Sequence, residues 1–503
     1  QAQQGNGSIG NPGGPAAAGR AGRGSGGGGG GGGRGARNGG GGGRGAAGDG
    51  NPAPPDGLYR ATFRGGYTLS FMVVDAANDT ATAHEVWHNQ PNARTFAAIN
   101  AIKWAGDNLI FQQEPEEWIR YYAVAVNGGT QTPIELTPGE GQLETLGLSP
   151  DGKTLFYASN VGDIDRRHVW RVPTAGGDAV ELTKDDEIEM YPAPLASGKQ
   201  VAVLTSSAIR PLSVGIIPAN GGAAKLIYPS LKDFPTSAEV APTAVVLKAD
   251  DGMEFHNQLF LPKDLKSGEK RPAIIFVHGG PIRQMLLGYH YMDFYHTAYA
   301  VNEWLQSQGY VVMSVNYRSG IGYGKSFRTA PNVGGRGNAE YKDVLAAGQY
   351  LQSRPDVDPA RVGIWGLSYG GVLTSQALAR NSDIFAAGVD MAGVHLWGTS
   401  LDPNDVSYKS STISAIDGWK SPVLIWQGDD DRNVEFSQTI GLVELLRQRN
   451  VYFELIVEPD DTHETLIHKR WLYTFGRMQD FLQRFLWDKN KNASTGSDRG
   501  GAR

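Results

Sequence analysis

The chain has 503 residues, of which 40% are hydrophobic and 10% aromatic, enough for a large core, so the composition excludes global disorder. Its formal net charge is −6; the first fifty residues carry about +4 and the rest about −10, which argues against a dedicated nucleic-acid binder. Cysteine is absent, which excludes disulfides, thiolate metal sites and a cysteine nucleophile. No apolar run is long enough to span a membrane.

Residues 1–57 are rich in Gly, Arg, Pro and Ala and predict a flexible, disordered arm, and residues 491–503 predict a disordered tail. The arginines among the glycines resemble an RNA-binding tract, but no aromatic residues interleave to stack on bases, which favours a solvated linker. The chain begins with Gln1 rather than Met, so we expect a processed or cut terminus. An exported location, periplasmic or extracellular, is slightly favoured over the cytoplasm.

Residues 58–240 predict an all-β domain of short strands with a repeated pattern. Double-glycine turns fall at Gly128, Gly176 and Gly221, and an earlier, fainter copy turns near Asn78. Units of four strands with a period of 40 to 50 residues are typical of β-propeller blades. The length of this region predicts about four blades.

Residues 241–490 predict a doubly wound, mostly parallel sheet, because apolar strand patterns alternate with helical ones. The helical patterns include 339–352 and 465–487. The expected strands lie at 272–280, 309–318, 361–368, 386–394, 421–429 and 452–459.

The strongest local motif is the G-x-S-x-G sequence at 366–370, which follows an apolar strand and precedes a helical pattern. A sharp strand-to-helix turn would lift the Ser368 hydroxyl off the sheet, as in the nucleophile of an α/β-hydrolase. A backbone N–H at Tyr369 would then be one donor to an oxyanion. The second donor would come from the glycine-rich turn His278-Gly279-Gly280-Pro281, which follows an earlier strand.

A serine nucleophile needs a histidine that acts as base and a carboxylate that orients this histidine. In α/β-hydrolases the order along the chain is Ser, then Asp or Glu, then His. Three aspartates, 429–431, follow one predicted strand, and chemistry alone leaves the choice among them open. His463 follows the next strand. His468 competes with it, but the pattern places His468 inside a helix, so we favour His463.

The runs WGLSYGG, HGGP, NYRSGIGYG and QGDDDRNV, behind a propeller pattern, resemble the prolyl oligopeptidase family of serine peptidases, which includes dipeptidyl-peptidase-IV-like and acylaminoacyl-peptidase-like enzymes. The resemblance extends over about residues 58–487. It implies hydrolysis of oligopeptides through an acyl-enzyme. The G-x-x-D-x-x-V pattern of the family selects Asp431, and its last-strand histidine corresponds to His463.

In the same way, the HGGP pattern of acylaminoacyl-like members points to Gly280 as the second oxyanion donor. His278 stands where dipeptidyl-peptidase-IV-like members have a tyrosine, so a tyrosine-assisted oxyanion hole is not expected. Propellers in the family usually have seven or eight blades. We therefore expect an incomplete propeller with the missing blades upstream of Gln1: either a companion N-terminal fragment of the same precursor supplies them, or the chain forms a half-ring with an unpaired edge near Leu58. The alternative partner is a second copy of the chain, in a homo-oligomer.

Two other motifs suggest different chemistry, a zinc site and a binding site for a substrate amine. The sequence His84-Glu85-Val86-Trp87-His88 matches the H-E-x-x-H zinc motif, which works only on a helix. Its surroundings indicate a strand, where histidines four residues apart lie roughly 13 Å apart, too far to share one ion. We therefore expect no metal and no organic cofactor.

The second is the acidic segment with Glu114, Glu116 and Glu117, of which Glu116 and Glu117 are candidate anchors for a substrate amine. A charged turn is usually only solvated, and we favour that interpretation, so exopeptidase and endopeptidase activity both stay open. The leading interpretation is a serine peptidase of oligopeptides, without a nucleic-acid partner. An esterase or amidase acting on small acyl compounds is the alternative, and a non-catalytic propeller that binds partners is the least favoured.

Overall fold

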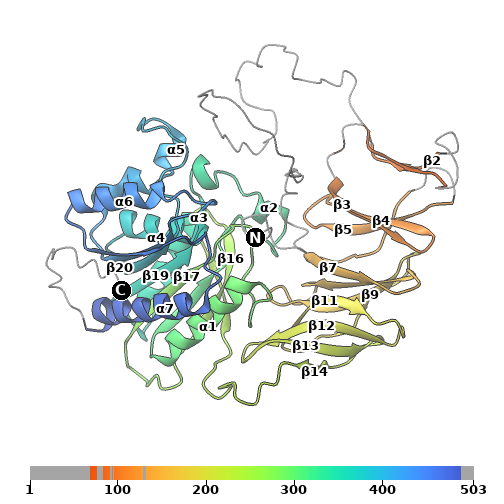
Figure 1. Cartoon of the computed structure of the whole chain (residues 1–503), viewed down its shortest axis with the longest axis horizontal. Helices are drawn as coiled ribbons and strands as arrows, with labels where there is room; N and C mark the ends of the chain where they lie inside the picture. The colour runs from red at the N-terminus through yellow and green to blue at the C-terminus, as the bar shows by residue number, and fades with distance from the viewer. Residues whose placement is uncertain (1–67, 76–82, 91–92, 94–95, 128–131, 489–503) are drawn as a thin grey trace, which may run out of the picture.

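The computed structural model describes residues 68–75, 83–90, 93, 96–127 and 132–488. The arm at 1–57 and the tail at 491–503 lie outside the described residues. The rest forms two parts, an all-β domain at the N-terminal side and an α/β domain at the C-terminal side (Figure 1). The exact domain boundaries proposed from the sequence remain predictions. The last strand of the β-domain ends at Tyr228, and the first strand of the α/β domain begins at Thr243.

The all-β domain contains three antiparallel sheets of four strands each and one two-stranded hairpin. Within each four-stranded sheet, strands adjacent in sequence pair with one another, as the repeat predicts. No strand pairing joins the first sheet to the last within the described residues, and the number of propeller blades stays a prediction. The strands are β1 (Ser70–Val73), β2 (His84–His88), β3 (Phe96–Ala105), β4 (Asn108–Gln113), β5 (Arg120–Ala125), β6 (Ile134–Glu135), β7 (Leu143–Leu148), β8 (Thr154–Ser159), β9 (His168–Pro173), β10 (Val180–Glu181), β11 (Glu187–Pro194), β12 (Gln200–Ser207), β13 (Arg210–Pro218) and β14 (Lys225–Tyr228).

The repeated glycine turns are explained by backbone geometry. Gly176 and Gly221, each between the third and fourth strands of a sheet, have φ values of 94° and 99°. Residues with a side chain rarely adopt this region, whereas glycine does so without strain. The equivalent turns near Asn78 and Gly128 lie outside the described residues.

The α/β domain is built on one eight-stranded sheet with the order β15-β16-β18-β17-β19-β20-β21-β22. The six strands from β18 to β22 along this order run parallel, and the β15–β16 hairpin is antiparallel. This confirms the expected mostly parallel sheet and adds the hairpin. The strands are β15 (Thr243–Lys248), β16 (Glu254–Phe260), β17 (Arg271–Val277), β18 (Val311–Val315), β19 (Val357–Leu367), β20 (Phe385–Met391), β21 (Val423–Gly428) and β22 (Phe453–Glu458).

Helices cover both faces of this sheet, so it has two cores. Helices α1 and α7 pack on one face, and α3, α4 and α6 on the other. The helices are α1 (Asp293–Ser307), α2 (Lys325–Arg328), α3 (Glu340–Ser353), α4 (Tyr369–Arg380), α5 (Val406–Lys409), α6 (Ser437–Gln448) and α7 (His468–Leu482), with short turns η2 (Gly334–Arg336), η3 (Thr412–Gly418) and η4 (Gln483–Trp487).

A buried polar network joins the two domains. Arg167 of the β-domain is 1% exposed; its Nε donates to Glu144 at 2.6 Å, and its Nη2 donates to Gln284 of the α/β domain at 2.6 Å. Nearby, the hydroxyl of Tyr323 donates across the interface to Asp165 at 2.8 Å. Arg167 and Glu144 belong to the same domain, but the bonds from Arg167 to Gln284 and from Tyr323 to Asp165 cross the interface, and these buried bonds fix how the two domains meet.

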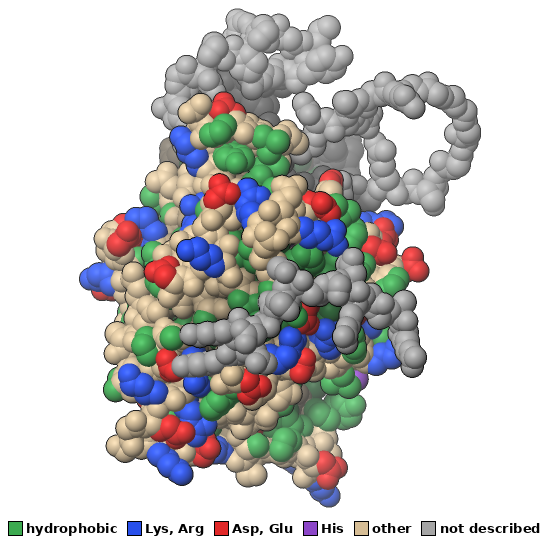
Figure 2. Space-filling model, turned by 90° about the vertical axis from the view of Figure 1, so that its left-hand side faces the viewer, with side chains coloured by type: hydrophobic (Ala, Val, Ile, Leu, Met, Phe, Trp, Pro, Cys, Tyr) green, Lys and Arg blue, Asp and Glu red, His purple; other side chains and the backbone are tan. Residues whose placement is uncertain are grey.

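The surface carries no large region of one charge on the face shown in Figure 2, where basic and acidic side chains are interspersed. Among the described residues, no helix is both long enough and apolar enough to cross a membrane.

Candidate active site

Ser368 occupies the single position between a strand and a helix. Strand β19 ends at Leu367 and α4 begins at Tyr369, as the G-x-S-x-G motif predicts. Its φ and ψ are 62° and −117°, a conformation that non-glycine residues rarely adopt and that costs about 1–3 kcal/mol. The backbone N–H of Ser368 donates to the Met391 carbonyl at 2.8 Å, which ties the turn to strand β20. Such strain at a strand-to-helix turn is typical of an activated serine.

The two glycines of the motif are required by the neighbouring strand. A Cβ atom on Gly366 would lie 2.5 Å from the carbonyl oxygen of Val277, and one on Gly370 would lie 2.1 Å from the same atom. Both distances are far below van der Waals contact. Any side chain at either position would push the turn away from β17, so the sequence motif follows from close packing under the serine.

Asp431 and His463 form a buried pair, 7% and 4% exposed. Nδ1 of His463 lies 2.7 Å from Oδ2 of Asp431, and Nε2 of Gln427 also donates to this oxygen at 3.1 Å. The other carboxylate oxygen, Oδ1, accepts the backbone N–H groups of Asn433 and Val434 at 2.8 and 3.0 Å. The carboxylate is therefore held from both sides, and it can orient the imidazole.

These contacts also set the charge of Asp431. Burial alone would raise its pKa, but the hydrogen bond from His463 and the backbone donors Val434 and Asn433 outweigh burial and lower the pKa below its ordinary value. Asp431 therefore stays ionised at neutral pH, as a group that orients a histidine must.

The other two aspartates of the loop have different surroundings. Asp429 is exposed and accepts the backbone N–H of Asp460 at 2.7 Å, which links the loops after β21 and β22. Asp430 is exposed and forms an ion pair with Arg432 at 2.9 Å. Of the three aspartates left open by chemistry alone, only Asp431 is buried and contacts His463. His468 is exposed and begins α7, three residues later than the helix start expected from the sequence.

The glycine-rich turn lies directly beside the serine. A Cβ atom on Gly279 would be 3.2 Å from the Cβ of Ser368 and 2.7 Å from the Leu367 carbonyl oxygen. Gly280 has a φ of 118°, which again requires glycine. The turn therefore brings the backbone of Gly279 and Gly280 next to the nucleophile position, where the N–H of Tyr369 also lies.

His278 supports this turn and does not face solvent. Its ring is fully buried, stacks on Tyr317 at 4.3 Å, and its Nδ1 lies 2.9 Å from the Gly279 carbonyl oxygen. Burial lowers the pKa of His278 to about 3, so the ring is neutral. The hydroxyl of Tyr317 donates to the His278 carbonyl at 2.7 Å. A buried neutral imidazole holds the turn in place.

Contacts with Glu340, Tyr317 and Trp397 hold the side chain of Tyr369 in place. Its hydroxyl donates to the buried carboxylate of Glu340 at 2.5 Å, and its ring stacks on Tyr317 at 5.9 Å. Trp397 lies on its other side, with ring centroids 5.9 Å apart. These rings make an apolar, aromatic wall beside Ser368.

The acidic segment contacts the α/β domain. Glu114 pairs with Arg328 at 2.5 Å, and Oε2 of Glu117 accepts the backbone N–H of Ser326 at 2.8 Å. The Ser326 N–H, partly offset by burial, lowers the pKa of Glu117. Glu116 is exposed. The segment is thus a contact between domains at α2, and the carboxylates of Glu114 and Glu117 are already engaged there.

The H-E-x-x-H sequence forms strand β2 and no helix. The two histidines contact different groups: Nε2 of His84 lies 2.9 Å from the Val126 carbonyl oxygen, and Nδ1 of His88 lies 2.7 Å from Glu85. Among the described residues, no cluster of three or more histidine or acidic side chains could hold a metal ion.

Sequence reasoning overlooked the residues that support the site from within the fold. Gln427, Glu340 and Arg283 are all buried polar residues beside it. A polar residue on an apolar strand, such as Gln427 on β21, is the signal that could have drawn attention to one of them.

The fold of the C-terminal domain is that of an α/β-hydrolase, with Ser368 on the turn between β19 and α4. Residues 295–489 match the family model described as "Prolyl oligopeptidase family", and residues 61–211 match the "Dipeptidyl peptidase IV (DPP IV) N-terminal region". Residues 295–489 thus belong to the prolyl oligopeptidase family, a family of serine-type peptidases.

Curated relatives include dipeptidyl aminopeptidase BIII of Pseudoxanthomonas mexicana, which is 28% identical over 249 residues, covering 44% of this chain and 35% of the relative. Human dipeptidyl peptidase 8 is 31% identical over 239 residues, covering 44% of this chain and 26% of the relative. The chain thus spans about a third or less of the length of these two proteins.

Solved structures share the fold. A puromycin-hydrolyzing peptidase from Mycobacterium tuberculosis superposes with a TM-score of 0.68 and 21% identity, covering 80% of this chain and 63% of that chain. Dipeptidyl peptidase 4 of Porphyromonas gingivalis gives a TM-score of 0.65 at 24% identity, covering 80% and 58%.

Proposed function

We propose that the protein is a serine peptidase that hydrolyses oligopeptides through an acyl-enzyme. In the first half-reaction, Ser368 Oγ bonds to the substrate carbonyl carbon, its proton moves to Nε2 of His463, and the carbonyl π electrons form an oxyanion. The N–H groups of Tyr369 and Gly280 bind that oxyanion. When the tetrahedral intermediate collapses, the C–N bond breaks and His463 gives its proton to the leaving amine.

The second half-reaction uses the same groups. A water molecule gives a proton to His463 and bonds to the acyl carbon, and Ser368 Oγ leaves with that proton. Asp431 holds the imidazole and stabilises its protonated form throughout. The observation that carries the proposal is the 2.7 Å contact between buried His463 and Asp431, in the same α/β domain as a serine on a strained strand-to-helix turn.

We also propose that the sheets of the β-domain are blades of a propeller that this chain does not complete. The last sheet, β11–β14, has a half-exposed apolar face with Leu204, Val214 and Ile216, beside the 70% exposed Tyr228. In a propeller such a face packs against the next blade. A further blade from the same precursor is the occupant we propose, and without it the ring would filter large peptides poorly.

The substrate class can be tested with a panel of peptides. The quantity to compare is the rate enhancement, which is kcat/KM relative to the rate of uncatalysed hydrolysis of the same substrate. We expect this enhancement to be larger for aminoacyl-p-nitroanilides and internally quenched peptides than for p-nitrophenyl acetate. Preference for the acetate would favour the esterase alternative, and no turnover of any substrate would favour a binding protein.

The same panel tests the candidate amine anchors. If Glu116 and Glu117 bind a substrate amine, Glu116→Gln and Glu117→Gln raise KM for free-amine peptides by about tenfold and leave N-acylated peptides unchanged, because each variant removes one charge near the amine. Glu140→Gln, an exposed acid of the same domain, is the matched control. Equal effects on free and acylated peptides would exclude the anchor role.

Metal removal gives a separate prediction. We expect chelators to leave hydrolysis unchanged, since the proposed chemistry uses only side chains and backbone donors. His84→Ala should cost stability at most, because His84 contacts a backbone carbonyl on a strand. Stoichiometric zinc that leaves together with activity would contradict this proposal.

A further inference from the structure

Arg283 is a buried arginine next to the glycine-rich turn. The residue is 6% exposed. Its backbone is anchored at both ends: its N–H donates to the Pro281 carbonyl at 2.7 Å, and its carbonyl accepts the N–H of Ile321 at 3.1 Å. The side chain therefore starts from a fixed point two residues after the turn.

The guanidinium of Arg283 has no acidic partner. Among the described residues, no carboxylate oxygen lies within 4.0 Å of it, and its Nε has no hydrogen-bond partner. Nη1 donates to the Ile282 carbonyl at 2.6 Å, and the guanidinium carbon lies 6.0 Å from the centre of the Tyr295 ring. Burying a cation in this way is costly unless an anion compensates it at some stage.

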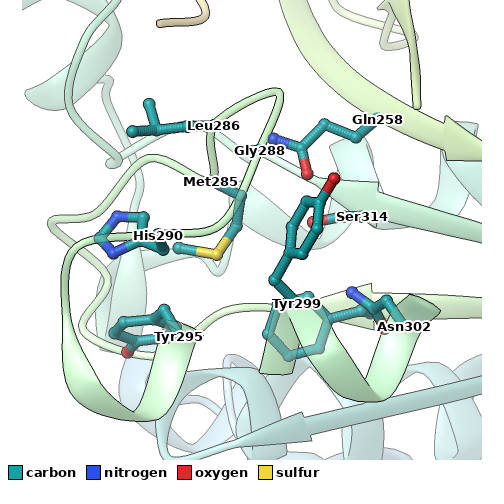
Figure 3. A pocket seen from close by; sticks show the side chains of 10 residues that line it. Gln258, Met285, Leu286, Gly288, His290, Tyr295, Tyr299, Asn302 and Ser314 are labelled. Carbon is teal, nitrogen blue, oxygen red and sulfur yellow. The ribbon is translucent and has the colours of Figure 1, made fainter. Parts of the chain in front are cut away.

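The buried rings around Arg283 are neutral. Burial lowers the pKa of His278 to about 3 and that of His290 well below its usual value, and it raises the pKa of Tyr295 to about 12. Figure 3 shows His290 and Tyr295 side by side at a small cavity of about 10 Å³, with the Tyr295 hydroxyl pointing away from it. Glu464, the residue after His463, is a carboxyl whose charge interacts with that of Arg283; burial raises the pKa of Glu464, and Arg283 partly offsets this rise.

The position of this cation relative to the reacting atoms follows from two close approaches. A Cβ atom on Gly280 would lie 3.0 Å from Cγ and 3.7 Å from Cζ of Arg283. The adjacent Gly279 is the residue whose Cβ would touch Ser368. The guanidinium therefore borders the turn that receives the substrate oxygen.

We propose that Arg283 supplies a fixed positive charge that stabilises the oxyanion formed when Ser368 attacks the substrate. This inference rests on the proposed function. The negative charge on the substrate oxygen appears only in the tetrahedral state, so the cation favours that state over the bound substrate. Arg283 acts beside the two backbone donors and takes no proton and forms no bond in the reaction.

The test is Arg283→Met, which keeps an unbranched stem but is shorter, and which removes the charge. We expect kcat to fall on the order of 10- to 100-fold with KM unchanged, because a charge beside the reacting oxygen in a buried site acts mainly on the transition state. The affinity of a peptide boronate, which forms an anionic tetrahedral adduct, should fall by the same factor. The affinity of a neutral peptide product should stay the same.

Arg283→Lys should recover most of the loss. Arg432→Met is the matched control, since it removes the same charge from a side chain that is 80% exposed on the Asp431 loop, and it should behave like the unchanged protein. If the methionine variant does not fold, the comparison of Arg283→Gln with Arg283→Lys again sets a neutral polar side chain against a charged one.

Two results would overturn the inference. One is an unchanged kcat and boronate affinity in the neutral variant. The other is a rise in KM confined to substrates that carry a carboxylate, which would make Arg283 a binding group for substrate anions. Labelling by a fluorophosphonate separates these failures from a failure of the proposed function: with normal labelling of Ser368, only the role of Arg283 is wrong.

Discussion

Replacing Ser368 by alanine is expected to abolish hydrolysis, with a loss on the order of 10⁶-fold, and to abolish covalent labelling by a fluorophosphonate. The reason is that the acyl-enzyme cannot form without the serine oxygen, and the remaining groups stabilise only the uncatalysed attack of water. The measurement is kcat on a peptide p-nitroanilide together with mass spectrometry of the labelled peptide.

The control is Ser437→Ala, which removes an exposed serine hydroxyl at the start of α6 and should leave both readouts unchanged. A double variant that lacks both Ser368 and His463 should be hardly worse than either single variant, because the members of such a triad act as a unit. Full activity in the Ser368→Ala protein would refute the assignment.

Replacing Asp431 by asparagine is expected to lower kcat by about 10⁴-fold while the protein stays folded. The amide cannot accept the His463 proton with the strength of a carboxylate, and its N–H₂ group can hold the imidazole in the wrong tautomer. The measurement is the pH profile of kcat alongside the thermal midpoint of unfolding.

Asp430→Asn is the matched control, because Asp430 is exposed and pairs only with Arg432. The pKa of Asp431 is lowered in the folded protein, so its contribution to stability is present above its ordinary pKa and is lost only as pH falls through the lower, folded value. Asp431 should therefore remain charged throughout the acid limb of the activity profile. Near-normal activity of Asp431→Asn would show that another group orients the base.

The parts of the site that depend on local backbone geometry could be predicted from the sequence. The glycines at 366 and 370 are fixed by the backbone of a neighbouring strand, so the motif that marks the Ser368 turn is visible along the chain. The alternation of strands and helices in the C-terminal half likewise follows from short-range patterns. The sequence pattern does not predict the β15–β16 hairpin, because β15 is a short, mostly exposed strand and the apolar residues of β16 are interrupted by His256, Asn257 and Gln258.

What could not be predicted depends on contacts between distant segments. The carboxylates at 429–431 are chemically equivalent in sequence, and only the approach of the loop that carries His463 distinguishes Asp431 from its neighbours. Arg283 and Arg167 are alike as residues. Among the described residues, Arg167 is paired with Glu144 of its own domain and Arg283 has no carboxylate partner, and this difference arises only when segments distant in the sequence come together in the fold.

The Arg167–Glu144–Gln284 network has a consequence for how heat inactivates the protein. Separating the domains would expose Arg167 and Glu144 to water, but it would also remove the partner of Gln284, whose side chain is 2% exposed beneath the active-site turn. Melting of the β-domain should therefore loosen the segment that carries Gly280 and Arg283, so catalysis should be lost at the temperature where the β-domain melts, even though the sheet that holds Ser368 has its own core.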